Sequence, residues 1–314
     1  MKKSKIKNQK SKISKIFFLT LFFILCFKFF TYLKAANAQS LSLSIWPPLL
    51  ELTIQPGKTA VQTYKLTNNS DHELQIFPLL AAFEPLGETG QIKIIKEPIN
   101  KNFFSFDSKE KFGEHFILGV GQTKELYLRI AIPVSAPERD YYNTLLFSSA
   151  EKELENLSGA SSSTQIGSNI LITVSKSDNP NRLGRILEFS SPKLVDSFSS
   201  VSFIVKLENW GKTFWKPFGQ IKIQGMFGEK KEIPLLEQNV LSQSARKLSV
   251  SPFKPKWPIG LFKAKIEFSP DKEGELLSSE TSFFYFPFKV FIFIFLGIVF
   301  GVFIKRIKVK QNTN

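Results

Sequence analysis

The chain has 314 residues, with 42 Lys and Arg against 27 Asp and Glu, and a formal net charge of +15. Nine lysines precede residue 39, and Lys289 and four further basic residues lie near the C-terminus, so residues 39–288 hold 28 basic and 27 acidic side chains. The positive charge therefore belongs to the two ends of the chain, which argues against a nucleic-acid-binding protein.

Residues 1–38 are predicted to be a signal peptide. They contain nine lysines and no acid, an apolar run from Ile16 to Phe27, and the sequence Ala36-Asn37-Ala38, a small-x-small pattern that signal peptidase recognises. If cleavage fails, residues 16–33 would remain as a signal anchor and the chain would cross a membrane twice.

The single cysteine, Cys26, lies inside this leader. Leu25 precedes it, where a bacterial lipobox has a small residue, so we expect no lipidation. The mature chain would then have no cysteine and would be held together by packing alone. An exported protein without disulfides favours a bacterial origin.

Residues 39–178 are predicted to form an Ig-like β-sandwich. Short β-prone runs alternate with turn-forming segments such as residues 55–58 and 68–71. Residues 150–164 are polar and low in complexity, and we expect an exposed hairpin loop there. The expected strands are 50–54, 61–67, 74–83, 91–96, 125–133, 141–149 and 166–175.

Residues 179–282 are predicted to form a second Ig-like β-sandwich, after a turn-rich boundary at residues 177–181. Residues 271–274 are predicted to form a last turn or a stalk. The expected strands are 184–189, 201–208, 219–225, 245–251 and 260–268.

Residues 283–304 are predicted to form a single transmembrane helix, and residues 305–314 a basic cytoplasmic tail. Residues 283–288 would be an aromatic belt at the membrane surface, with Lys289 reaching toward water. The chain is thus expected to be a single-pass cell-membrane protein with an extracellular N-terminal ectodomain.

Signals of enzymatic chemistry are poor. The two histidines, His72 and His115, are expected to lie in a turn and at the start of a strand, and no cluster has the spacing of a metal site. We therefore expect no catalytic residue, metal or cofactor. A cell-wall hydrolase stays open as an alternative, because a glycosidase needs only two carboxylates.

The tryptophans are the candidates for a binding surface. Trp210 and Trp215 flank a predicted turn, and an exposed tryptophan can stack on a sugar or anchor a protein interface. The alternative is core packing, which we expect for Trp46 at the edge of the first domain.

Several turn motifs occur in a recognisable order. Residues 47–58 read Pro-Pro-Leu-Leu-Glu-Leu-Thr-Ile-Gln-Pro-Gly-Lys, and residues 64–70 follow as Tyr-Lys-Leu-Thr-Asn-Asn-Ser. Later come Asn209-Trp210-Gly211, the Pro-Phe-Gly-Gln-Ile of residues 217–221, and the Val-Leu-Ser-Gln-Ser-Ala-Arg of residues 240–246. This order resembles that of bacterial WxL-interacting cell-surface proteins, although Ser242 stands where proline is usual.

The resemblance implies a pilus-chaperone-like first domain that contacts peptidoglycan and a second domain that contacts partner proteins. We interpret Gly57, Gly211 and Gly219 as residues that set backbone geometry, and we expect Arg246 to pair locally. The first hypothesis is therefore a non-enzymatic, membrane-anchored protein that binds wall polymer or surface proteins. The alternative is a structural scaffold for another envelope complex.

Overall fold

The computed structural model describes residues 43–95, 98, 100–150, 165–177, 180, 182–271 and 274–311. The predicted signal peptide and nearly all of the predicted 150–164 loop lie outside these residues.

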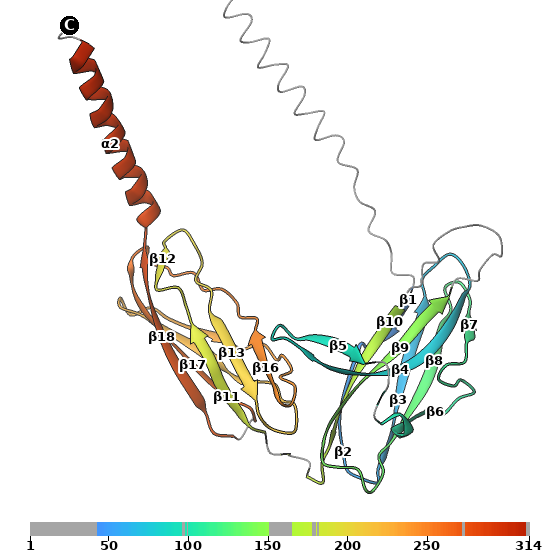
Figure 1. The fold of residues 1–314 in the computed structure, drawn as a ribbon. Helices are drawn as coiled ribbons and strands as arrows, with labels where there is room; N and C mark the ends of the chain where they lie inside the picture. The colour runs from blue at the N-terminus through green and yellow to red at the C-terminus, as the bar shows by residue number, and fades with distance from the viewer. Residues whose placement is uncertain are drawn as a thin grey trace, which may run out of the picture. The chain divides into compact units, whose positions relative to one another are not determined.

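The first part of the chain folds into two sheets (Figure 1). One sheet has the order β1 (Leu43–Trp46), β3 (Thr59–Asn68), β8 (Thr123–Ala131) and β6 (Phe104–Phe106), with the 3-10 turn η1 (Lys101–Phe103) before β6. The other has the order β2 (Leu49–Ile54), β10 (Gln165–Val174), β9 (Arg139–Ala150), β4 (Leu74–Leu86) and β5 (Gln91–Ile95), and β7 (Phe116–Leu118) also pairs with β4. Only the β2–β10 pairing among these described strands is parallel.

Alternation of apolar and polar residues explains how these sheets pack. On β3, Tyr64 and Leu66 are fully buried while Lys65 between them is exposed. Side chains of both sheets meet in one core, in which β8 supplies Leu126 and Leu128. Two sheets that share one buried layer make this part a β-sandwich.

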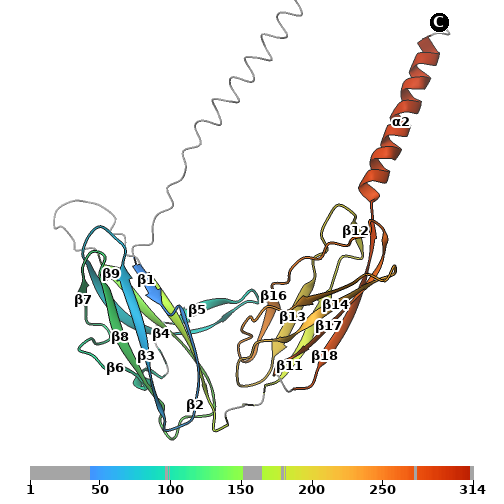
Figure 2. The ribbon, with the colours of Figure 1, turned by 180° about the vertical axis from the view of Figure 1, so that it is seen from behind.

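The second part of the chain forms another pair of sheets (Figures 1 and 2). The smaller sheet has the order β11 (Gly184–Ser190), β13 (Ile204–Asn209) and β16 (Ser244–Leu248). The larger has the order β12 (Leu194–Asp196), β18 (Leu277–Phe286), β17 (Gly260–Ser269), β14 (Phe218–Gly225) and β15 (Lys230–Pro234). Their inner faces share a second hydrophobic core, so the prediction of a chain built from Ig-like β-sandwiches is confirmed in its coarse form.

The sequence analysis predicted no strand after residue 268, but residues 277–286 form strand β18. This strand pairs with β17 over nine residue pairs, and Phe283 and Tyr285 are 1% exposed. The Tyr285 hydroxyl donates hydrogen bonds to the carbonyls of Ser197 and Ser199. The segment is thus an inner strand of the larger sheet.

The predicted transmembrane helix at residues 283–304 needs correction. Residues 283–286 belong to β18, so the helix α2 (Phe288–Gln311) begins later than predicted and has fewer of the apolar residues. Within the described part of the chain, no helix has both the length and the apolar character needed to cross a membrane.

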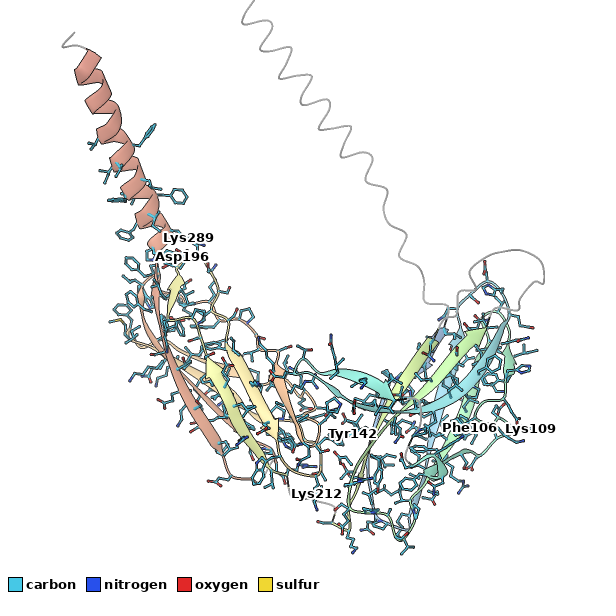
Figure 3. The ribbon with its side chains drawn as sticks, in the orientation of Figure 1. Phe106, Lys109, Tyr142, Asp196, Lys212 and Lys289 are labelled. Carbon is cyan, nitrogen blue, oxygen red and sulfur yellow. The ribbon has the colours of Figure 1, made fainter. Side chains whose placement is uncertain are left out.

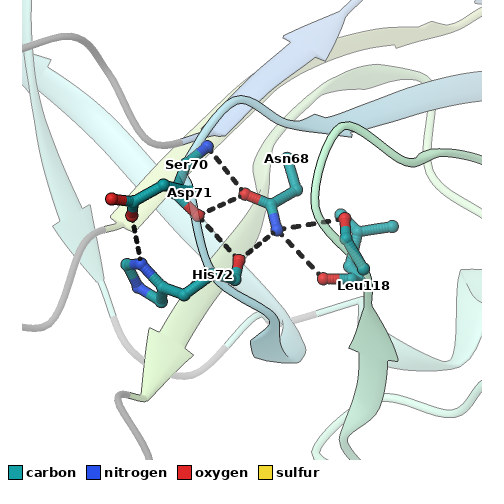
Figure 4. Close-up of polar contacts among 6 residues, drawn as sticks. Asn68, Ser70, Asp71, His72 and Leu118 are labelled. Carbon is teal, nitrogen blue, oxygen red and sulfur yellow. Dashed lines mark hydrogen bonds and ion pairs between the residues drawn. The ribbon is translucent and has the colours of Figure 1, made fainter.

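A buried asparagine closes one end of each sandwich. The side-chain amide of Asn68 donates to the carbonyls of His72, Leu118 and Gly119, and its oxygen accepts from the Ser70 backbone N–H (Figure 4). Asn209 repeats the pattern at the end of β13, with donation to Thr213 and Val240 and acceptance from the Gly211 N–H. Both residues are 0% exposed, so the Asn-rich turns are structural.

Candidate functional site

The two tryptophans proposed from the sequence lie in different environments. Trp215 is 2% exposed, stacks on Phe268 with 5.9 Å between ring centroids, and donates from Nε1 to the Leu183 carbonyl at 3.3 Å. Its ring is therefore a core element that no ligand can reach. Trp210 is 55% exposed and stays available for contact, as does Trp46 at 63%, which we had expected to pack.

The histidines make only local contacts. His72 lies in the turn after β3, and its Nδ1 is 2.8 Å from Asp71 Oδ1 (Figure 4). His115 precedes β7, and its ring lies 5.5 Å from that of Phe77. Within the described ranges, no group of three His, Cys, Asp or Glu side chains could hold a metal ion.

The outer face of the six-stranded sheet is partly covered, because consecutive residues on two of its strands are buried. Residues 80–83 of β4 and 170–174 of β10 are all buried, on both faces of their strands. A sheet that faces water on one side would alternate. Both sandwiches belong to one compact unit that begins at Ser42, and hydrogen bonds from the second sandwich reach this face.

Asp140 on β9 is the centre of these contacts. Its carboxylate accepts hydrogen bonds from the Tyr142 hydroxyl, the Thr173 hydroxyl at 2.7 Å and the Phe214 backbone N–H. Its own backbone N–H donates to the Lys212 carbonyl at 3.2 Å; Tyr142 and Lys212 are labelled in Figure 3. One side chain thus links β9 and β10 of the first sandwich to the 212–214 loop of the second.

The environment of Asp140 disfavours its charge. Burial raises the pKa of this carboxyl to about 6, against the lowering effect of its three hydrogen bonds. Burial also raises the pKa of Tyr142, which the adjacent Asp140 charge raises further. The Tyr142 hydroxyl in turn accepts from the Ser242 N–H at 2.8 Å, so the network continues into the segment before β16.

Glu51 on β2 makes a second polar link. Its carboxylate lies 2.7 Å from Lys216 Nζ and also accepts a hydrogen bond from the side-chain amide of Asn239. The Glu51 and Lys216 side chains are 27% and 29% exposed. Partial burial makes this pair less sensitive to salt than a surface ion pair.

A cleft of about 290 Å³ lies beside these links. Its apolar wall comes from the six-stranded sheet, and its polar wall comes from residues 237–246, which include Arg246 and one acidic residue, Glu237. The apolar lining residues of the six-stranded sheet are Leu49 on β2, Phe83 and Pro85 on β4, Ile92 on β5, and Leu171 on β10.

Arg246 is the most unusual group of the cleft. It is half-buried, burial lowers its pKa, and its guanidinium donates through Nη1 to the Asn239 carbonyl. The buried Nε has no hydrogen-bond partner, and no carboxylate of the described residues pairs with the side chain. The expected local pairing is thus limited to one backbone carbonyl.

The β4–β5 hairpin holds this arginine from the other side. A Cβ at Gly90, whose φ is +81°, would lie 2.5 Å from Arg246 Nη2 and 2.6 Å from Cζ. Only a glycine lets the guanidinium lie against the turn. The turn is fixed to the second sandwich because the Lys247 N–H donates to the Glu88 carbonyl at 2.7 Å and Lys206 pairs with the Glu88 carboxylate.

The sequence reasoning missed Asp140, Tyr142 and Glu51, and it noted Arg246 only as a local partner. No short motif marks these residues, because their hydrogen-bond partners in the other sandwich lie 72 to 188 positions away. The glycine interpretations fit the geometry: Gly57 has φ +80°, and a Cβ at Gly219 would lie 2.0 Å from the Glu267 carbonyl oxygen.

No family model and no curated protein matches the chain. Solved structures with similar chains include the class 5 fimbriae chaperone CfaA, at 10% identity and a TM-score of 0.39, with 77% of this chain and 98% of that chain covered. A structure of Salmonella enterica SafA pilin in complex with the SafB chaperone is similar at 11% identity and a TM-score of 0.37, with 77% of this chain and 98% of that chain covered. The E. coli chaperone DraB is similar at 13% identity and a TM-score of 0.36, with 78% of this chain and 97% of that chain covered. Membership of the WxL-interacting proteins stays a prediction.

Proposed function

We propose that this chain is a non-enzymatic binding protein that takes a carboxylate-bearing segment of a protein partner into the cleft between its sandwiches. The proposal rests on Arg246. Its guanidinium is half-buried, lines a cleft with an apolar wall, and has an N–H donor without a hydrogen-bond partner.

The chemistry of the guanidinium selects the ligand. A charge withdrawn from water is costly unless it is paired, and a carboxylate is the group that matches the planar donors of arginine. The hydrogen bond to the Asn239 carbonyl fixes the position of the guanidinium and leaves donors over. A carboxylate bound in the cleft would pair with the guanidinium donors that the Asn239 carbonyl leaves over.

The size of the cleft selects an extended segment. Its volume of about 290 Å³ is just below the usual range for ligand pockets, roughly 300–1,000 Å³. It therefore suits a chain terminus or a short strand better than a globular surface. Strand β5 is the last strand of its sheet, with Ile94 and Ile95 42% and 38% exposed, and such an edge can pair with an extended peptide.

We also propose that the protein works at the cell surface. The signal peptide predicted for residues 1–38 supports export, and the order of the turn motifs supports a cell-surface setting like that of the WxL-interacting proteins. The peptide stems of peptidoglycan also end in carboxylates, and Trp210 is exposed for stacking on a sugar. Wall polymer is therefore the second candidate ligand.

The test uses the full chain and a library of short peptides with free or amidated C-termini, followed by fluorescence polarisation of the best binders. We expect binding of the free-acid forms and a loss of about 10- to 100-fold in the Arg246→Gln variant, the effect of one charged hydrogen bond. Arg185→Gln is the matched control, because Arg185 pairs with Glu208 on the surface of the second sandwich.

Equal binding of acid and amide, or equal binding by wild type and Arg246→Gln, would contradict the proposal. Sedimentation of the same variants with isolated peptidoglycan separates the two candidates. Retention that depends on Arg246, with no peptide binding, would assign the cleft to wall stems.

A further inference from the structure

An apolar collar surrounds one end of the second sandwich, where helix α2 leaves it. We define this collar by eight exposed side chains, whose exposed fractions run from 39% at Phe284 to 71% at Phe198. The collar consists of Leu194, Phe198, Met226, Phe227, Trp257, Ile259, Leu261 and Phe284.

Ring contacts, hydrogen bonds and strand pairing join these residues into one surface. Phe227 and Trp257 lie 6.0 Å apart by ring centroid, and the Met226 N–H donates to the Leu261 carbonyl at 2.9 Å. In the sheet register, Phe284 lies between Leu261 on β17 and Leu194 on β12. The Ser197 hydroxyl donates to the Pro258 carbonyl, which brings the loop that carries Phe198 to the loop that carries Trp257.

The base of helix α2 continues this surface. Phe286 stacks on Phe284 at 5.9 Å and on Phe291 at 5.0 Å. The Lys289 N–H donates to Asp196 Oδ2 at 3.0 Å, which fixes the first turn of the helix to the end of β12 (Figure 3). The aromatic residues of strand, loops and helix are thus held in place rather than flexible.

The charges beside the collar are mainly positive. Four segments that carry or adjoin the collar residues, namely 193–199, 226–230, 254–260 and 286–290, contain five lysines and two acids. Both acids have local partners: Asp196 accepts from the Phe198 and Lys289 N–H groups, and Glu229 accepts from the Lys256 N–H. The lysines, all exposed, are Lys193, Lys230, Lys254, Lys256 and Lys289.

We propose that the apolar collar and its lysines are a docking surface for an anionic lipid layer. Exposed apolar patches mark interaction sites, and tryptophan and phenylalanine side chains with flanking lysines match the apolar-polar boundary of a lipid surface. Lysines near such a surface are attracted by anionic headgroups. A protein partner would need acidic side chains around an apolar centre, and nothing in the described residues favours that over lipid.

The other end of the second sandwich supplies an internal control. Strand β17 runs from Gly260 at the collar to Ser269 at the far end. Trp210 lies at that far end, where its backbone N–H donates to the Leu183 carbonyl. Trp210 is 55% exposed and Trp257 is 54% exposed, so the two rings differ in position and not in accessibility.

The experiment adds the full chain to vesicles with brominated acyl chains, made from phosphatidylcholine with or without phosphatidylglycerol. The difference in fluorescence between wild type and Trp257→Phe isolates Trp257, and the Trp210→Phe difference isolates the control ring. We expect bromine to quench Trp257 in the anionic vesicles and to leave Trp210 unquenched.

A double variant tests the charge. Lys254→Gln with Lys256→Gln should weaken binding to anionic vesicles about 30-fold, from the contribution of two lysines. Lys222→Gln with Lys265→Gln, in the middle of the same sheet and paired with Glu267, should leave binding unchanged. Unquenched Trp257, equal quenching of both rings, or equal binding to neutral vesicles would overturn the proposal. It does not depend on the cleft, because Arg246 takes no part in it.

Discussion

Asp140 gives a prediction that joins electrostatics to the contact between the sandwiches. Its pKa is raised to about 6 from an ordinary value of 3.8, chiefly by burial. The folded protein therefore binds a proton in a pH range where the unfolded chain has lost it. Linkage then requires that this residue contributes stability fully below about pH 4 and loses that contribution as the pH rises through 6.

The size of the effect follows from the shift. A displacement of about 2 pKa units corresponds to about 3 kcal/mol in the free energy of unfolding, which is an upper limit for a group that is partly exposed to water. Asp140→Asn removes the titration and keeps an oxygen that can accept from Tyr142 and the Phe214 N–H. At neutral pH the variant should thus be more stable than wild type by up to this amount.

The assay is urea denaturation of wild type and Asp140→Asn from pH 4 to pH 7. In the difference between the two free energies of unfolding, the contributions of the titratable groups that both proteins share cancel. We expect the free energy of unfolding of the wild type to fall relative to that of the variant as the pH rises from 4 to 7. Tyr142→Phe removes a hydrogen bond that lowers the pKa of Asp140, so in this variant the change should extend above pH 6. Parallel curves for wild type and Asp140→Asn would refute the reasoning.

Three further predictions concern the second sandwich, each measured by chemical denaturation of the full chain. Asn209→Ala removes three buried hydrogen bonds and should lower the free energy of unfolding by about 2–4 kcal/mol; a neutral effect would show that water replaces the amide. Gly219→Ala puts a Cβ 2.0 Å from the Glu267 carbonyl oxygen and should cost about 3 kcal/mol or more, so an unchanged midpoint would contradict the register of β14 on β17. Trp215→Ala should cost about 3–5 kcal/mol and Trp210→Ala less than about 0.5 kcal/mol; the reverse order would contradict their burial.

Trp210 and Trp215 show what a short stretch of sequence cannot predict. Both flank the same turn, and nothing in residues 209–216 separates an exposed ring from a buried one. Only the packing of Phe268 from β17 and the Leu183 carbonyl gives Trp215 its place in the core. Burial depends on contacts that are distant in sequence, which a short window does not contain.

Strand β18 shows a different limit. Its aromatic residues Phe283 and Tyr285 were assigned to a membrane boundary because they directly precede an apolar stretch. In the structure they alternate with Phe284 and pair with β17, and both are buried in the core of the second sandwich. An apolar run that is only moderately long fits a strand as well as a helix, and strand pairing decides between them.

Residue types and their spacing over a few positions were enough to predict the β-rich class and the turns at Gly57 and Asn68, and they show that residues 39–288 contain no cysteine. Tertiary structure alone decided that Asp140 is shared by two sandwiches, that Arg246 lies against Gly90, and that Trp257 is next to Phe227. These contacts join segments 30 to 156 residues apart, and only the register of paired strands fixes which of them meet.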